Sequence, residues 1–151
     1  MTARMIPVAP FEREDFTRMA VQHFSELNRS FVPAEDWREH YFPSILSNPD
    51  FFLRWILGDE AKAGFILFGL EKHRFLPRKI GAIYELYVSP EFRRRGLGKA
   101  IAREAIRELW THSPSKVQLE VIEGRTEAAE LWSSLGFKKV TARYVLSEGR
   151  P

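Results

Sequence analysis

Seven consecutive residues, 93–99, combine the residue types that bind phosphate. They read Arg-Arg-Arg-Gly-Leu-Gly-Lys and stand where an amphipathic helix is expected to begin. The first backbone N–H groups of a helix have no internal partner and carry partial positive charge. Gly96 and Gly98 leave room for an anion and permit the positive φ angles that aim successive N–H groups at it. The segment therefore predicts a phosphate-binding loop.

Two common phosphate loops do not match this segment. The Rossmann loop needs G-x-G-x-x-G, and the Walker loop needs G-x-x-x-x-G-K followed by Ser or Thr. The spacing here is Arg93-x-x-Gly96-x-Gly98, and it follows a strand-like run and a Ser-Pro-Glu turn at 89–91. In this frame the segment closely resembles the acyl-CoA loop of the GNAT superfamily of N-acetyltransferases.

The resemblance implies how acetyl-CoA would be held. In this family the strand before the loop offers backbone hydrogen bonds to the pantetheine arm, and the loop N–H groups bind the pyrophosphate. The N–H of Val88 would polarise the thioester carbonyl, as in an oxyanion hole. The expected acetyl-CoA-binding residues are Leu86, Tyr87, Val88, Arg93, Arg94, Arg95, Gly96, Leu97, Gly98, Lys99, Arg125 and Trp132.

Glu85 is the candidate general base. An acceptor amine is protonated at neutral pH and must lose a proton before it can attack a thioester. Strand alternation predicts that Ile83, Glu85 and Tyr87 share one face, beside the expected thioester. The alternative is that Glu85 is the structural partner of an arginine such as Arg54, and the sequence leaves both interpretations open.

The last expected helix departs from the family pattern at two positions. Arg125 stands where many members have asparagine, and Trp132 stands where many have a tyrosine near the CoA sulfur. An indole N–H cannot protonate a leaving thiolate, so Trp132 either packs against the pantetheine arm or belongs to the core. The proton donor is left open among water and three tyrosines, Tyr84, Tyr87 and Tyr144.

Hydrophobic periodicity predicts an α/β (α+β) chain with a mixed sheet of six or seven strands and about four helices. Expected strands cover 6–8, 51–57, 63–71, 80–88, 116–122 and one or two within 137–146. Expected helices cover 15–28, a piece from Pro33 that Pro43 disturbs, 97–110 and 126–135. The segment 28–48 is therefore expected to be irregular. A strand-helix-strand crossover over 80–122 predicts a parallel pair, and the element order matches the GNAT fold over nearly the whole chain.

Composition limits the class of protein. The 151 residues suit one GNAT-like domain, 1–151, and contain no cysteine, which excludes a cysteine nucleophile and favours direct acetyl transfer. The N-terminal residues 1–11 lack the apolar core of a signal peptide, and the longest apolar run, 63–70, is too short to span a bilayer, so we expect a cytoplasmic protein without membrane contact. The four histidines show no metal-ligand spacing, and no metal is expected.

The sequence thus predicts a GNAT-type N-acetyltransferase that moves an acetyl group from acetyl-CoA directly to an amine. Acidic and aromatic residues within 26–41 suit a cationic acceptor, whereas Arg29, Arg38, Arg54 and Arg74 suit one with a carboxylate. Small amines, amino acids, antibiotics and protein amines all remain open. The alternatives are a non-catalytic acyl-CoA sensor and, remotely, a nucleic-acid-binding module, which a net charge of +3 does not favour. Apolar final strands would leave an edge for a homodimer.

Overall fold

The computed structural model describes residues 1–149. Contacts between Cα atoms divide the chain into two compact units, Met1–Glu120 and Val121–Pro151. The second unit holds one helix, α4 (Thr126–Ser134), which ends before Gly136 at a φ of +96°. That ending is the predicted one, since glycine is the usual residue for a left-handed helix terminus. The single-domain organisation stays a prediction.

The first unit is built on one five-stranded sheet in the order β1-β2-β3-β4-β5. Its strands are β1 (Ala3–Pro7), β2 (Phe51–Gly58), β3 (Ala61–Lys72), β4 (Lys79–Val88) and β5 (Val117–Leu119). The first four strands pair antiparallel, and β5 lies parallel to β4 after the crossover through α3. The predicted α/β class and parallel crossover are confirmed.

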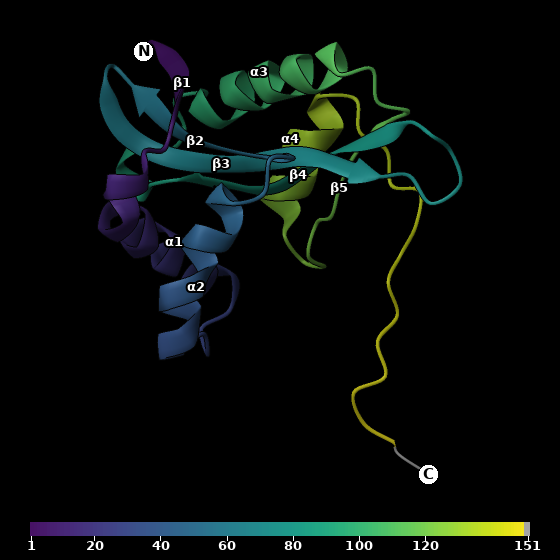
Figure 1. Ribbon diagram of the computed structural model, residues 1–151, viewed down its shortest axis with the longest axis horizontal. Helices are drawn as coiled ribbons and strands as arrows, with labels where there is room; N and C mark the ends of the chain where they lie inside the picture. The colour runs from purple at the N-terminus through teal and green to yellow at the C-terminus, as the bar shows by residue number, and fades with distance from the viewer. Residues whose placement is uncertain (150–151) are drawn as a thin grey trace. The chain divides into compact units, whose positions relative to one another are not determined.

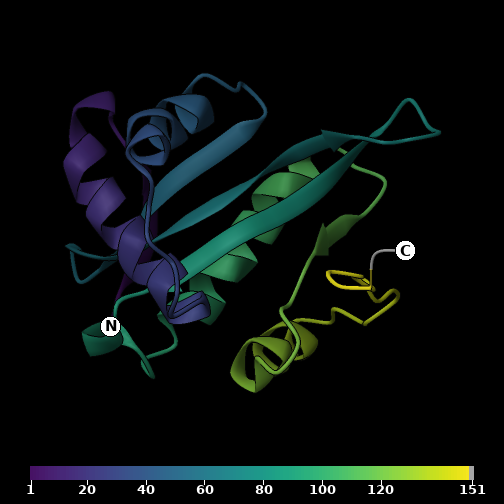
Figure 2. The same cartoon turned by 90° about the horizontal axis from the view of Figure 1, so that it is seen from below.

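Helices cover both faces of this sheet (Figure 1). Figure 2, seen from below, has α1 (Arg13–Leu27) and α2 (Glu35–Leu46) in front of the strands, and α3 (Leu97–Thr111) lies behind. On the first face Phe16 of α1 is fully buried and meets Phe65 of β3 edge-on at 5.0 Å between ring centroids. On the other face the amphipathic helix α3 buries an apolar stripe, Leu97, Ile101, Ala105 and Leu109.

The prediction that 28–48 is irregular was wrong for α2, because Pro43 lies inside that helix. Proline removes one intrahelical donor, but the ladder resumes where Ser47 N–H donates to the Pro43 carbonyl at 2.9 Å. Phe42 and Ile45 on either side are both 3% exposed. Their burial against the sheet holds the helix together through the proline.

The six- or seven-stranded sheet was also a wrong expectation, because residues 137–149 contain no strand. The segment has the β-branched and aromatic residues typical of strands, yet Val140, Tyr144 and Val145 are between 76% and 94% exposed. Strand propensity stabilises a strand only where it can pack on neighbouring strands. The homodimer was argued from this edge and stays a prediction.

A bulge in β4 changes which side chains share a face. Ile83 pairs with Phe68 and Glu85 pairs with Leu67, so Tyr84 is an extra residue opposite two consecutive partners. Consecutive partners point to opposite faces, and Ile83 and Glu85 therefore do as well. The expectation that Ile83 shares a face with Glu85 was wrong. No helix within residues 1–149 is long and apolar enough to cross a membrane.

Candidate active site

The loop between β4 and α3 holds a run of backbone N–H groups without acceptors. After a short turn, Pro90–Phe92, the N–H of Arg93 donates to the Pro90 carbonyl at 3.2 Å. The next N–H with a hydrogen bond is that of Ala100, which donates to the Gly96 carbonyl at 3.1 Å. The amides of residues 94–99 have no acceptor within the described structure. They form a row of donors at the start of a helix.

The loop backbone is shaped for close approach to an anion. Arg94 has a φ of +63° and Gly96 a φ of +79°, and such alternation turns successive N–H groups toward one side. A left-handed conformation at a residue other than glycine costs about 1–3 kcal/mol and is concentrated at functional sites. The strained conformation of Arg94 therefore forms no backbone hydrogen bond from the amides of 94–99 within residues 1–149, which is consistent with a functional loop.

Gly98 is not required by packing within the protein. A Cβ placed there would lie 3.8 Å from Val88 Cγ2 and 4.0 Å from Leu86 Cδ2, which is ordinary contact. A Cβ on Gly96 would meet nothing within 4 Å. The space beside Gly96 is open, and a Cβ on Gly98 would be in ordinary contact only, so packing within the protein requires neither glycine.

The Arg93 side chain fastens the loop to its neighbours. Its Nε donates to the Val88 carbonyl at 2.7 Å, and its Nη2 donates to both carboxylate oxygens of Glu26 at 2.8 Å. Arg94 and Arg95, in contrast, have exposed side chains. The structure thus places Arg93 as a clamp between the loop, β4 and α1, and its role toward acetyl-CoA stays a prediction.

The end of β4 has a free edge beside this loop. β4 pairs with β5 only over Gly81–Ile83, so five more residues of β4 run beyond the last β5 partner. The N–H of Ser89 donates to Ala63 of β3 at 2.7 Å, and extended backbone alternates in direction. The N–H groups of Val88 and Leu86 therefore point to the edge that faces away from β3.

Tyr87 has the opposite backbone orientation. Its carbonyl faces β3, where a Cβ on Gly64 would lie 1.9 Å from the Tyr87 oxygen. The Tyr87 side chain is buried, and its hydroxyl lies 3.5 Å from Oε1 of Gln22 in α1. Of the three strand residues expected to bind pantetheine, Leu86 and Val88 thus offer backbone N–H groups at the free edge.

Glu85 is paired with a histidine that lies 62 residues away in sequence. His23 Nε2 of α1 lies 2.5 Å from Glu85 Oε2, and the two side chains are 10% and 23% exposed. The His23 ring is enclosed by Phe24, Phe65 and Tyr87 at 5.0 to 5.7 Å between centroids. The second carboxylate oxygen, Oε1, has no hydrogen-bond partner among residues 1–149. One oxygen is fixed by the protein and the other is left for a ligand.

The suggested Arg54 partner of Glu85 was wrong. Arg54 makes a two-fold contact with Glu108 of α3, at 3.1 and 3.0 Å, on the other face of the sheet. One signal pointed to the real partner, because His23 falls on the apolar face of the first predicted helix. A polar side chain on a buried face needs a hydrogen-bonding partner.

One tyrosine, Tyr41, interacts with the negative charge of Glu85. Burial and the negative charge of Glu85 raise the pKa of Tyr41. Burial and Glu26 likewise raise the pKa of Tyr87. Tyr84 was another candidate proton donor, but its hydroxyl donates a hydrogen bond to Glu71 Oε1 at 2.8 Å. Tyr41 and Tyr87 therefore keep their protons at neutral pH and are able to donate hydrogen bonds.

The structure describes Arg125 and Trp132, the two predicted site residues of the second unit, by their contacts within that unit. Arg125 directly precedes α4, and Trp132 on the helix is 8% exposed and meets Phe137 edge-on at 5.6 Å. This is the core packing that the sequence offered as one of two interpretations of Trp132. Contact of either residue with acetyl-CoA stays a prediction.

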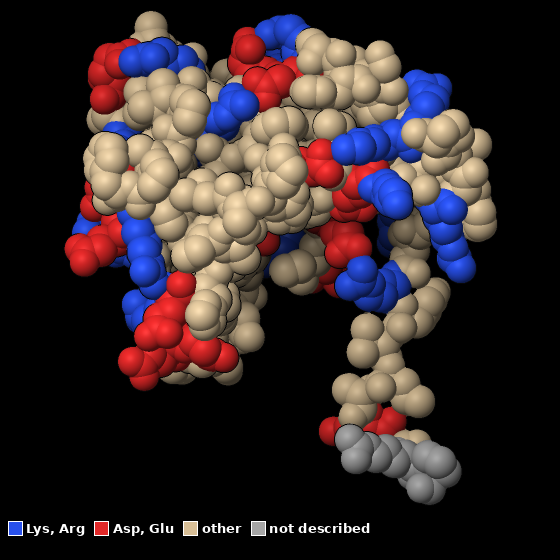
Figure 3. All heavy atoms as spheres, viewed as in Figure 1, with Lys and Arg blue, Asp and Glu red and all other residues tan. Residues whose placement is uncertain are grey.

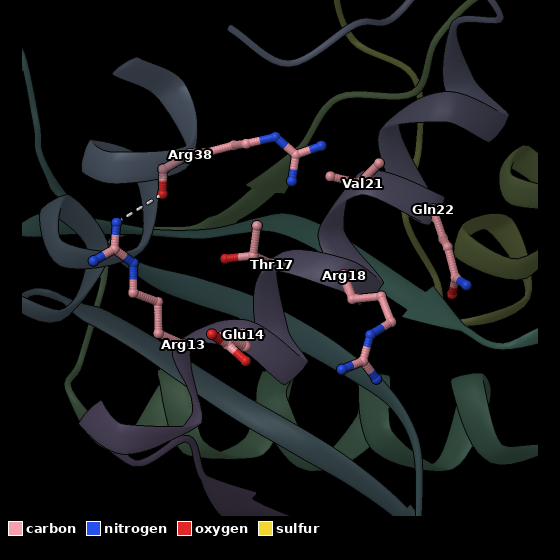
Figure 4. Close-up of a pocket in the computed structure, with 7 residues that line it drawn as sticks. All are labelled: Arg13, Glu14, Thr17, Arg18, Val21, Gln22 and Arg38. Atoms are coloured by element: carbon pink, nitrogen blue, oxygen red, sulfur yellow. Dashed lines mark hydrogen bonds between the residues drawn. The ribbon is translucent and has the colours of Figure 1, made fainter. Parts of the chain in front are cut away.

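A groove of about 670 Å³ lies along α1 but contains no predicted site residue (Figure 4). Arg13 donates to the Arg38 carbonyl at 3.1 Å across one end of it. Its lining residues are Arg13, Glu14, Thr17, Arg18, Val21, Gln22 and Arg38. Neither the loop nor Glu85 lines the groove, but its lining residue Gln22 lies 3.5 Å from the Tyr87 hydroxyl.

Known proteins share both the sequence pattern and the fold. The sequence profile of the Acetyltransferase (GNAT) family matches residues 13–137. The ribosomal protein bS18 alanine N-acetyltransferase of Salmonella typhimurium (strain LT2) is 30% identical over 122 residues, which are 66% of this chain and 82% of that protein.

Two solved structures have the same fold at low identity. The aminoglycoside N-acetyltransferase AAC(6')-Iy, in complex with a bisubstrate analogue, is 15% identical with a TM-score of 0.77, covering 100% of both chains. A ribosomal-protein-alanine N-acetyltransferase from Brucella melitensis is 15% identical with a TM-score of 0.74, covering 97% of this chain and 100% of that one. Because the profile spans most of the chain and the fold agrees, the chain belongs to the GNAT acetyltransferase family, whose co-substrate is acetyl-CoA, and it is an enzyme that acetylates an amine.

Proposed function

We propose that the loop and the free edge of β4 together form the acetyl-CoA site. The observation that carries this proposal is the row of amides at 94–99 without acceptors, at the start of α3. The pyrophosphate would accept hydrogen bonds from these amides, while Arg94 and Arg95 add positive charge. The pantetheine arm would run along β4 and bond to Leu86 and Val88.

In this arrangement the thioester carbonyl lies at the N–H of Val88. The acceptor nitrogen attacks the carbonyl carbon, and the negative charge that develops on oxygen is stabilised by that N–H. Collapse of the tetrahedral intermediate breaks the C–S bond, so that the acetyl group ends on nitrogen and CoA leaves as its thiolate. The geometry supports this role because the Val88 N–H points to the free edge.

Glu85 would accept the proton that the amine must lose. Its free Oε1 is the basic atom, and His23 holds Oε2. The substitution Glu85→Gln keeps the size of the side chain but removes the base. Turnover should fall most at lower pH, where the acceptor amine is most protonated, while acetyl-CoA binding is kept. A pH-rate profile equal to that of the wild type would reject the base assignment.

The acetyl-CoA site is tested by thermal melts with and without the ligand. A ligand at a hundredfold its dissociation constant stabilises by about 2.7 kcal/mol, or roughly 5–10 °C for a domain of this size. Gly98→Leu should fold, because the protein leaves room there, yet lose the shift. Glu104→Leu, on the exposed face of α3, is the matched control and should keep it. A wild type that does not shift at millimolar acetyl-CoA would overturn the proposal.

A further inference from the structure

We propose that four aromatic side chains beside Glu85 form the acceptor subsite, and that it takes a primary ammonium carried on an apolar or aromatic group without a carboxylate. This inference rests on the proposed function, since it names the substrate class for the same site. The aromatic cluster consists of Phe24 of α1, Phe31 of the following turn, and Trp37 and Tyr41 of α2.

The aromatic cluster is continuous and only partly covered. Trp37 stacks on Tyr41 at 4.8 Å between centroids with an angle of 15° between the rings. Phe24 meets Phe31, Trp37 and Tyr41 at 5.5 to 6.0 Å. All four side chains keep intermediate exposure, unlike Phe16 beneath them, which is fully buried. The cluster thus extends the core to the surface and presents aromatic area to solvent.

The aromatic cluster adjoins the proposed base. His23, which holds Glu85, contacts Phe24 at 5.0 Å between ring centroids. The charge of Glu85 also acts on the Tyr41 hydroxyl, which has no hydrogen-bond partner among residues 1–149. An ammonium placed between them would meet the free Glu85 oxygen and the Tyr41 oxygen, with aromatic faces around it. Rings of this kind attract cations as well as apolar groups.

Surface charge favours a cationic acceptor on this side. Figure 3 shows acidic side chains gathered at the outer end of α2, and the first turn of that helix carries Glu35 and Asp36. Trp37 follows directly, and its backbone N–H donates to Asp36 Oδ1 at 2.9 Å. Negative potential beside an aromatic surface raises the local concentration of cationic ligands.

Three of the four arginines that suggested a carboxylate-bearing acceptor lie away from the aromatic cluster. Arg54 is bound by Glu108 on the far face of the sheet, Arg38 lines the groove along α1, and Arg74 lies over Phe75 of the hairpin between β3 and β4. Arg29 is exposed in the turn after α1. A carboxylate next to the reacting amine would therefore face Glu85 and the acidic end of α2, which repel it.

The test compares three amines by the rate of CoA release with saturating acetyl-CoA. Phenethylamine and ethylamine differ by the aromatic group, and phenethylamine and L-phenylalanine differ by the carboxylate. We expect kcat/KM for phenethylamine to exceed both of the others by at least tenfold. Trp37→Leu should reduce this preference by about tenfold through KM for phenethylamine, with KM for acetyl-CoA unchanged. Phe31→Leu is the second variant should Trp37→Leu melt early.

Phe75→Leu is the matched control, because Phe75 is 80% exposed on the far hairpin and should leave all rates unchanged. Equal rates with phenethylamine and ethylamine, or a preference that survives both cluster variants, would overturn the subsite alone. L-Phenylalanine accepted as well as phenethylamine would overturn the exclusion of carboxylates. A protein that binds acetyl-CoA but releases no CoA with any amine, peptide amines included, would overturn the proposed catalysis itself.

Discussion

Replacing His23 by phenylalanine should destabilise the protein, because it removes the hydrogen bond between His23 and Glu85. The ring is nearly conserved in size, and its surroundings are already aromatic, so the substitution leaves no large cavity. It removes the donor at 2.5 Å from Glu85 Oε2, in a pair whose side chains are 10% and 23% exposed. A hydrogen bond to a charged group contributes about 1.5–3 kcal/mol. At roughly 2–4 °C per kcal/mol, the melting temperature should fall by about 3–12 °C.

A double-mutant cycle separates this bond from the other effects of the substitution. His23→Phe, Glu85→Gln and the double variant are melted in urea at pH 7, and the coupling free energy is expected to be about 1–2 kcal/mol. His23→Gln keeps a neutral donor near the position of Nε2 and should recover most of the stability. His23→Gln should also recover most of the turnover that His23→Phe loses, because the glutamine amide again donates a hydrogen bond to Glu85 Oε2.

Three results would refute this reasoning. A coupling free energy below about 0.5 kcal/mol would mean that the pair does not stabilise the fold. Wild-type turnover in His23→Phe would mean that Glu85 needs no fixed orientation to act. A large loss of stability shared equally by His23→Phe and His23→Gln would assign the effect to the shape of the ring and not to its hydrogen bond.

Three further substitutions test the geometry around the site. Gly64→Ala should prevent folding or lower the melting temperature by more than about 10 °C, because its Cβ would lie 1.9 Å from the Tyr87 carbonyl; circular dichroism measures this. Gly96→Ala should cost about 1–2 kcal/mol in urea unfolding because of its φ of +79°. Burial raises the pKa of Glu12, but Lys62 and the Ala9 N–H lower it below 4.5 on balance. Ionised Glu12 therefore stabilises the folded protein above pH 4.5, and this stabilisation is lost as the pH falls through the lowered pKa of Glu12. The melting temperature of Glu12→Gln should depend less on pH in this acidic range than that of the wild type.

The phosphate loop and most elements were predictable because their signals are local. Two glycines, a basic run and the start of an amphipathic stripe lie within seven residues, and α3 begins at Leu97 as predicted. The hairpin from β2 to β3 was also predictable. Asp59 and Glu60 follow Gly58 with φ of +48° and +70°, which is the turn geometry that joins two close antiparallel strands.

The Glu85 pair and the bulge were not predictable, because their causes lie far apart in sequence. His23 and Glu85 are separated by 62 residues, and their contact depends on how α1 packs on the sheet. The bulge at Tyr84 depends on the register between β3 and β4. A prediction from strict alternation of side chains cannot include the extra residue of a bulge, and it therefore assigns Ile83 to the wrong face. Residues 137–146 mislead in the opposite way, since they have strand residues without strand partners.

The identity of the partner of Glu85 matters for the chemistry. An arginine partner is always charged and would hold the carboxylate in its ionised form, which opposes uptake of a proton from the acceptor. The structure commits Arg54 to Glu108 and Arg93 to Glu26, and so keeps both guanidinium groups from Glu85. Histidine is different, because it donates a hydrogen bond while neutral. The His23 ring holds Oε2 by a single contact, so the carboxylate is oriented while Oε1 stays available to accept a proton, which a general base needs.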